Sequence, residues 1–300
     1  MFLVTGAAGF IGYHVVRRLL EGGAAVVGVD SLDPYYDPAL KRARLARLGS
    51  SGGFRFVAGD VAAEGALDAA LPPADVRIVV HLAAQAGVRH SLEAPFAYER
   101  ANVAGHLAVL EYARRAPQLA HLVYASSSSV YGDRTDGPFH EDDRCDAPES
   151  LYAATKRACE LMSESYARLY DIPQTGLRFF TVYGPWGRPD MAYYAFTDKI
   201  LTGQPLTLYG DGLLARDFTY IDDVVETISR IVAAPPSGRP RHALYNIGNS
   251  TPSRVLDLVA AIERATGAKA ITQNAPLQPG DVTRTFADHG RATRAFGFTP

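Results

Sequence analysis

The chain has 300 residues, of which 47% are hydrophobic and 21% charged, a balance typical of a folded globular protein rather than a disordered one. Thirty lysines and arginines oppose 32 aspartates and glutamates, so the formal net charge is −2 and neither nucleic acid nor an anionic membrane is favoured as a partner. Two cysteines without metal-ligand spacing predict no disulfide framework and no metal site, and no apolar run reaches the length of a membrane span.

Short apolar runs alternate with helical patterns, starting at MFLVTG without a leader pattern, so we expect a cytoplasmic protein. The runs are MFLVT, AAVVGVD, FRFVAGD and VRIVVHLA. They are too apolar to have one wet face, which predicts an α/β, Rossmann-type fold with a doubly wound parallel sheet between two layers of helices.

The regular alternation decays after the run TGLRFFTVYG at 175–184. We therefore expect a nucleotide-binding domain over residues 1–175, with later segments near 215–247 returning to it. Residues 176–300 should form mainly a smaller substrate-binding domain.

Three glycines in TGAAGFIG, Gly6, Gly9 and Gly12, lie between the first predicted strand and helix. Glycine lets the backbone approach a pyrophosphate, whose charge the helix N-terminus stabilises. A tight turn would explain the glycines alone, but the second strand also ends in Asp30, whose carboxylate can accept hydrogen bonds from ribose hydroxyls and would repel a 2′-phosphate. The pattern predicts binding of NAD rather than NADP.

Further cofactor contacts are expected next to the glycines and at the ends of the third and fourth strands, where small residues admit a ligand. They are Phe10, Ile11, Asp60, Val61, Leu82, Ala83 and Ala84.

Tyr152 and Lys156, in SLYAATKRA, are four residues apart on a predicted helix and therefore lie on one face of it. A phenol is a poor base at neutral pH, but an ammonium one turn away and a positive nicotinamide ring would stabilise the phenolate. An incidental pair on an amphipathic helix is the alternative. The glycine motif and the run SSSSVYG at 126–132 favour a catalytic pair.

The sequence resembles the extended short-chain dehydrogenase/reductases in TGAAGFIG, HLAAQAGV, SSSSVYG, YAATK and RDFTYIDD. Within that superfamily it is most similar to the UDP-glucuronate 4-epimerases in DSLDPYYDPALK, AAQAGVRHSLE, SLYAATK, LRFFTVYGPWGRPDMA and LQPGDV. The resemblance implies an isomerase with tightly held NAD, a UDP-sugar substrate, and a homodimer built on helices around 95–116 and 150–170.

The resemblance also implies catalytic roles for Ser127, Tyr152 and Lys156. Tyr152 as phenolate would remove the proton of the sugar 4-hydroxyl while NAD takes the hydride, and Ser127 would bond the same oxygen. The 4-keto intermediate would then turn and recover the hydride on its other face.

A 4-keto glucuronate is a β-keto acid and loses carbon dioxide readily, so an epimerase must prevent that loss. Relatives that decarboxylate have a glutamate just before Val-Tyr-Gly, where this chain has Ser129, and 4,6-dehydratase relatives have Asp-Glu at the positions of Ser128 and Ser129. We expect Ser128 and Thr181 to hydrogen-bond the carboxylate. Ser126 and Ser129 are expected only to satisfy backbone groups at the strand end.

The remaining expected substrate and cofactor contacts follow from the same resemblance. Arg188 could pair with the carboxylate or a phosphate, Arg216 should bind the diphosphate, and Asp281 could orient Arg216. The other candidates are Gln278, in place of a second phosphate arginine, Asn102 on the substrate side and Phe179 on the nicotinamide side.

Three alternatives remain beside UDP-glucuronate 4-epimerisation. A neutral UDP-hexose 4-epimerase is disfavoured by Thr181 and GRPDMA, and a UDP-glucuronate decarboxylase by the missing glutamate. An NAD-binding regulator without turnover is disfavoured because Ser127, Tyr152 and Lys156 are all present.

Overall fold

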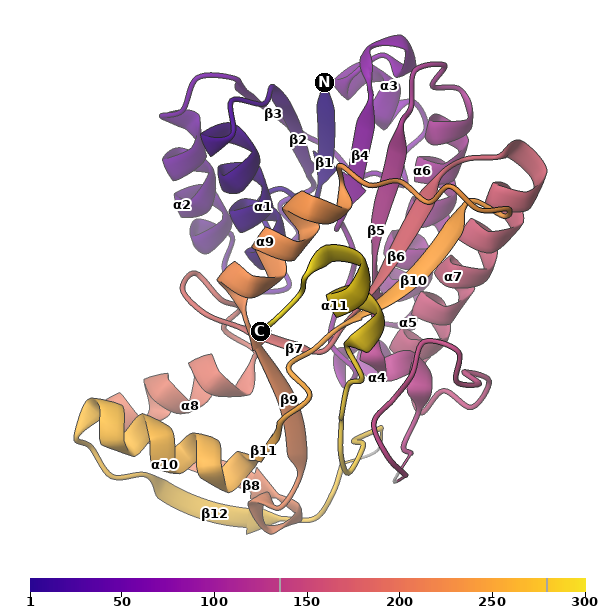
Figure 1. The fold of residues 1–300 in the computed structure, drawn as a ribbon. Coiled ribbons are helices and arrows are strands. Elements are labelled where there is room, and N and C mark those ends of the chain that lie inside the picture. The colour runs from indigo at the N-terminus through magenta and orange to yellow at the C-terminus, as the bar shows by residue number, and fades with distance from the viewer. Residues whose placement is uncertain (135, 279) are drawn as a thin grey trace.

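A seven-stranded parallel sheet forms the centre of the molecule in the computed structural model, which describes residues 1–134, 136–278 and 280–300 (Figure 1). Its strand order is β10-β6-β5-β4-β1-β2-β3. The strands are β1 (Phe2–Thr5), β2 (Val26–Asp30), β3 (Phe54–Ala58), β4 (Ile78–His81), β5 (His121–Ser127), β6 (Gln174–Phe179) and β10 (His242–Ile247). The order reverses between β1 and β4, where such sheets bind ligands beyond the carboxyl ends of their strands. The predicted fold class is confirmed.

Helices cover both faces of this sheet. Alternate residues of β1 belong to different cores: Val4 packs with the first, and Leu3 packs with the second. The first layer contains α1 (Phe10–Glu21), α2 (Pro38–Gly49) and α9 (Ile221–Ile231). The second contains α3 (Ala66–Ala70), α6 (Gly105–Arg114) and α7 (Leu151–Tyr170). This two-sided burial explains why the strands are almost uniformly apolar.

Short helical segments occupy several connections around the sheet and the end of the chain. They are the 3₁₀ turns η1 (Pro73–Asp75) and η3 (Ser128–Tyr131), the helices α4 (His90–Glu93) and α5 (Pro95–Tyr98), the π-helix η2 (Glu99–Ala104), and α11 (Gly290–Phe296).

A smaller lobe lies beyond the carboxyl ends of the strands, at the bottom of Figure 1. It contains a three-stranded sheet, β11-β9-β7, and a two-stranded sheet, β12-β8. The elements are β7 (Thr181–Tyr183), α8 (Ala192–Leu201), β8 (Pro205–Tyr209), η4 (Gly210–Gly212), β9 (Ala215–Tyr220), β11 (Pro252–Arg254), α10 (Val255–Thr266) and β12 (Ile271–Ala275). The expected boundary at 175 falls inside β6, and β10 of the 215–247 segment pairs with β6. We propose to place the boundary after β6.

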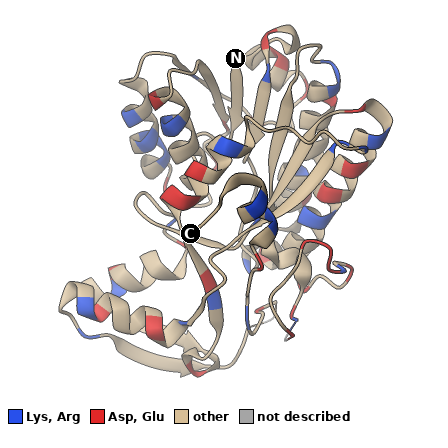
Figure 2. Cartoon of the chain, in the orientation of Figure 1, with Lys and Arg blue, Asp and Glu red and all other residues tan. Residues whose placement is uncertain are grey.

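Lysines and arginines are interspersed with aspartates and glutamates over most of the surface helices (Figure 2). Helix α2 is an exception, because its charged residues are all basic. None of the helices in the described ranges is long and apolar enough to cross a membrane.

Candidate active site

A cavity of about 1050 Å³ lies between the carboxyl ends of the main strands and the smaller lobe. Its size is at the upper end of the range for small-molecule sites, as a dinucleotide together with a second ligand requires. All of the cofactor-binding residues expected from the sequence line it: Gly6, Gly9, Phe10, Ile11, Gly12, Asp30, Asp60, Val61, Leu82, Ala83, Ala84, Tyr152, Lys156 and Phe179.

The glycine motif folds back on itself at the start of α1. A Cβ atom on Gly12 would lie 2.0 Å from the carbonyl oxygen of Gly6, so only glycine lets the helix begin this close to the preceding strand. Gly6 has a φ of +70°, and a Cβ atom there would lie 2.7 Å from the backbone of Leu82. The loop therefore keeps its backbone bare toward the cavity, as contact with a pyrophosphate requires.

Asp30, at the end of β2, fixes the loops around it. Its Oδ2 accepts a hydrogen bond from the backbone N–H of Ala8 at 3.1 Å, and its Oδ1 accepts one from Leu32 at 2.8 Å. Lys41 lies 3.4 Å from Oδ1 and is also at the cavity wall. The carboxylate retains acceptor capacity for ribose hydroxyls, as expected.

A partner of Asp60 was not anticipated from the sequence. Arg100 donates two hydrogen bonds to Asp60 Oδ2, at 2.9 and 2.8 Å, and lines the cavity beside it. Arg100 follows Glu99 on a stretch with no motif, so only the three-dimensional structure brings these two residues together.

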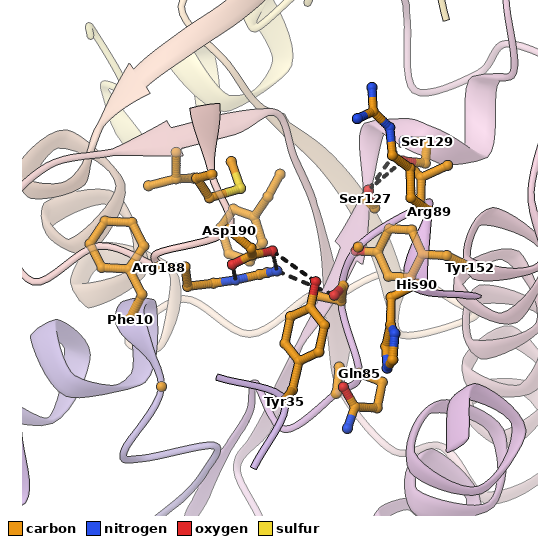
Figure 3. A pocket seen from close by; sticks show the side chains of 18 of the residues that line it. Phe10, Tyr35, Gln85, Arg89, His90, Ser127, Ser129, Tyr152, Arg188 and Asp190 are labelled. Carbon is orange, nitrogen blue, oxygen red and sulfur yellow. Dashed lines mark hydrogen bonds and ion pairs between the residues drawn. The ribbon is translucent and has the colours of Figure 1, made fainter. Parts of the chain in front are cut away.

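The proposed catalytic residues meet at the end of β5. Tyr152 and Lys156 face the cavity from α7, whose N-cap residue Ser150 accepts a hydrogen bond from Ala153 N at 3.2 Å. Lys156 donates to the carbonyl oxygen of Ala125 at 2.9 Å, which leaves two of its three N–H groups for other partners. Ser127 lines the same cavity as Tyr152 and donates a hydrogen bond to the Ser129 hydroxyl at 3.2 Å (Figure 3).

Ser126 has a different role from the one expected. Its hydroxyl does not merely satisfy backbone groups, since it donates to Glu160 Oε1 at 2.6 Å. Glu160 is one turn after Lys156 on α7 and also accepts two hydrogen bonds from Arg178 of β6, at 2.8 and 2.9 Å. Burial would raise the pKa of Glu160, but the bonds from Arg178 outweigh it and hold that pKa below its usual range. This buried pair connects β5, β6 and α7 behind the serine run.

Arg188 reaches the cavity from the loop after β7. It pairs with Asp190, which also accepts a hydrogen bond from Tyr35 at 3.1 Å (Figure 3). Burial opposes its charge, yet Asp190, Tyr35 and Tyr152 together raise the pKa of Arg188 above its usual range, so it stays cationic. Its Nη1 makes no hydrogen bond with any described residue, which leaves donors for a ligand.

A second group of basic residues lies at the lobe end of the cavity. Arg216 is partly buried on β9, and burial lowers its pKa from the usual value. Asp281 does not hydrogen-bond Arg216; it forms an ion pair with Arg89 at 2.9 Å. The Arg89 guanidinium also stacks over the Tyr209 ring, 4.3 Å from its centroid. Arg89 and Arg216 both line the cavity.

Two expected substrate residues are not at the cavity wall. The side chain of Asn102 is buried behind it, where its amide bonds the backbone N–H and carbonyl of Gln85 at 2.9 and 3.0 Å. Gln278 is likewise absent from the lining, whereas Ser127, Ser128, Thr181, Arg188, Arg216 and Asp281 are present. Asn102 thus shapes the loop after β4 rather than contacting the cavity itself.

Tyr35 and Asp190 line the cavity but were missed as individual residues. Both lie in stretches that carried the sequence resemblance, DSLDPYYDPALK and GRPDMA, and that was the available signal. Tyr35 donates directly to Asp190, and this contact depends on two loops separated by 155 positions.

Comparison with known proteins agrees with this geometry. The model of the "NAD dependent epimerase/dehydratase family" matches residues 2–248. A Rhizobium meliloti (strain 1021) protein named "Probable UDP-glucuronate 4-epimerase" is 48% identical over 315 residues, covering 100% of this chain and 92% of the relative. UDP-glucuronate 4-epimerase 3 of Arabidopsis thaliana is 46% identical, covering 99% of this chain and 72% of the relative. The crystal structure of the Bacillus cereus UDP-glucuronic acid 4-epimerase with UDP-glucuronic acid and NAD matches with a TM-score of 0.93 at 34% identity, covering 100% of this chain and 93% of that one.

Proposed function

Because the chain belongs to the NAD dependent epimerase/dehydratase family, we propose that it is a UDP-glucuronate 4-epimerase, an isomerase that forms UDP-galacturonate with NAD as its cofactor. One observation carries the choice of substrate. The wall beside Tyr152 offers neutral hydroxyls of the serine run and the cationic Arg188, with no acidic side chain at 126–129.

The nucleotide end fits NAD. The bare backbone at Gly6 and Gly12 leaves the room that a pyrophosphate needs, and Asp30 presents acceptors at the end of β2. Bound NAD accepts a hydride from carbon 4 of the sugar and later returns it. The diphosphate of NAD would be held by the glycine motif, at Gly6, Gly9, Phe10, Ile11 and Gly12. Asp30 would bind the adenosine ribose of NAD.

The chain's own residues would handle the proton at the sugar 4-oxygen. Tyr152 removes the hydroxyl proton when the hydride leaves carbon 4 and gives it back when the hydride returns. Ser127 hydrogen-bonds the same oxygen, and Lys156, held by the Ala125 carbonyl oxygen, keeps two N–H groups with which to bind the cofactor ribose. No net oxidation results, so no further reductant is needed.

The substrate carboxylate would lie between Ser128, Thr181 and Arg188. These residues can hold the carboxylate near the plane of the carbon 4 carbonyl. In that orientation the bond between carbon 5 and the carboxylate, which breaks when carbon dioxide is lost, overlaps poorly with the carbonyl π system. The diphosphate of the UDP-sugar would lie toward Arg216 and Arg89, whose planar guanidinium groups suit phosphate oxygens.

We place the enzyme in the cytoplasm, where both buried cysteines would stay reduced. Detection of the protein in a membrane or secreted fraction would contradict this location.

We also propose a homodimer built on α5, α6 and α7. Large apolar side chains on these helices are solvent-exposed: Phe96 is 85% exposed, Leu161 55% and Leu169 68%. We expect sedimentation at twice the chain mass and a shift to monomer in Leu161→Glu. Leu201→Glu, on the exposed face of α8, should not change the mass; a monomeric wild-type protein would contradict the proposal.

Proton NMR of the purified protein with UDP-glucuronate and no added cofactor tests the function. UDP-galacturonate is the expected product. UDP-xylose or a 4-keto pentose would identify a decarboxylase instead. If only UDP-glucose is epimerised, the protein is a neutral-sugar enzyme, and no turnover of either sugar despite bound NAD would support a regulator.

Ser128→Glu should damage the handling of the carboxylate. Placing a second negative charge beside it should raise KM for UDP-glucuronate by about tenfold or more, and increase the decarboxylated by-product. Ser128→Gln is the matched control, since it adds similar volume without charge. Unchanged KM and product purity in Ser128→Glu would mean that the serine run does not contact the carboxylate.

A further inference from the structure

Arg44 of α2 is completely buried, with 0% of its surface exposed, yet it has no carboxylate partner among the described residues. Its Nη1 donates to Ala8 O at 2.9 Å and to the Tyr36 hydroxyl at 2.7 Å. Its Nε and Nη2 donate to Trp186 O at 3.2 and 2.6 Å, and Nη2 also donates to Gly187 O at 3.1 Å. An arginine has five N–H groups, and all five are used.

These acceptors belong to three segments that are distant in sequence. Ala8 lies in the glycine motif, Tyr36 lies in the loop that follows Asp30, and residues 186–187 directly precede Arg188. Arg44 therefore connects the cofactor loop to the loop that carries Arg188.

The loop at Trp186 requires such support. Trp186 has a φ of +61°, a left-handed conformation that a bulky residue rarely adopts. Arg44 donates to the carbonyl oxygens of both Trp186 and Gly187, and Arg47 stacks over the Trp186 ring at 5.2 Å. A lysine could offer three donors from a single point but not the planar fork that reaches all three segments.

We propose that Arg44 is a positioning residue that fixes Arg188 in the cavity and makes the position of that loop depend on the glycine motif. The argument for its effect on the substrate rests on the proposed function, in which Arg188 faces the sugar carboxylate. Arg44 itself touches neither substrate nor cofactor, because it is buried behind both loops.

The test compares Arg44→Lys with Arg42→Lys. Arg42 lies on the same helix, is exposed and makes no hydrogen bond within the described ranges. In Arg44→Lys we expect KM for UDP-glucuronate to rise about tenfold with a smaller change in kcat. The reason is that the charge-assisted contact between Arg188 and the sugar carboxylate is displaced. The decarboxylated fraction per turnover should also rise, and bound NAD should remain. Arg42→Lys should match the wild type in all of these.

A cycle with Arg188→Met shows whether Arg44 acts through Arg188. If it does, the double variant Arg44→Lys/Arg188→Met should have the same KM as Arg188→Met alone. Additive losses would overturn the proposal. Should Arg44→Lys fail to fold, Tyr36→Phe removes one of the acceptors of Arg44 and should move KM in the same direction by a few fold.

Trp186 gives a readout that does not depend on activity, because it is the only tryptophan in the chain. In Arg44→Lys the Trp186 fluorescence should be quenched more strongly by acrylamide, measured without substrate at equal NAD content. Unchanged quenching together with unchanged KM would refute the inference. Increased quenching in a protein that does not act on UDP-glucuronate would instead refute the proposed function and leave the role of Arg44 in the loop intact.

Discussion

Tyr152→Phe should lower kcat by about 10²–10⁴-fold, the usual contribution of a positioned acid–base group. The substitution removes only the hydroxyl, and the ring should keep its edge-on packing against Tyr98, 6.1 Å away between centroids. Bound NAD should therefore remain. The rate is followed by proton NMR with UDP-glucuronate, and NAD is measured after denaturing the protein.

Tyr166→Phe is the matched control for this change. It makes the same substitution about four turns further along α7, where the hydroxyl donates to Glu111 at 2.6 Å, away from the cavity. It should leave kcat unchanged. Turnover near the wild-type rate in Tyr152→Phe would exclude Tyr152 as the base.

Arg178→Met should be strongly destabilising, lowering the free energy of unfolding by about 3–5 kcal/mol. Arg178 and Glu160 are each about 1% exposed, so removal of the guanidinium leaves a buried carboxylate without its main partner. It also leaves the Tyr131 hydroxyl and the Glu141 carbonyl without the hydrogen bonds that Arg178 donates. Urea unfolding of the NAD-loaded protein measures the loss.

Two comparisons separate this pair from ordinary surface charges. Arg168→Met breaks an exposed pair with Glu164 on the same helix and should cost less than about 1 kcal/mol. Arg178→Met/Glu160→Leu removes both charges and should recover part of the loss. A cost for Arg178→Met no greater than that of Arg168→Met would show that the buried pair is not stabilising.

The same pair sets a direction for pH dependence. Because the folded-state pKa of Glu160 is lowered, the ionised carboxylate contributes to the free energy of unfolding. This contribution is complete above the ordinary glutamate pKa and is lost as the pH falls through the lowered value. The wild type should therefore lose more stability on acidification than the double apolar variant.

Local patterns in the sequence predicted the parallel sheet and the placement of Tyr152 and Lys156 on one face of a helix. Alternating apolar runs and helices determine the sheet because each strand is buried on both faces, and the four-residue spacing of Tyr152 and Lys156 places them on one helix face by geometry alone. The glycine spacing works in the same way, since close backbone approach at Gly12 leaves no room for a Cβ atom.

Contacts between distant segments could not be predicted in this way. Asp281 accepts a hydrogen bond from Arg89, which is 192 positions away, and not from Arg216. The side chain of Asn102 hydrogen-bonds the backbone of Gln85 behind the cavity wall. Arg44 lies in a helix with four basic residues whose composition resembles a solvated face. Only the packing of three loops around it explains why its charge is completely buried.

The pairing of β6 with β10 has a consequence for synthesis of the chain. These adjacent strands are separated by residues 180–241, which build much of the smaller lobe. At translation speeds of about 5–20 residues per second, the edge of β6 would wait roughly 3–12 s for its neighbour. During that interval its unpaired N–H and C=O groups could accept a strand from another nascent chain. We therefore expect the yield of folded enzyme to depend on how quickly the part of the message that encodes residues 180–241 is read.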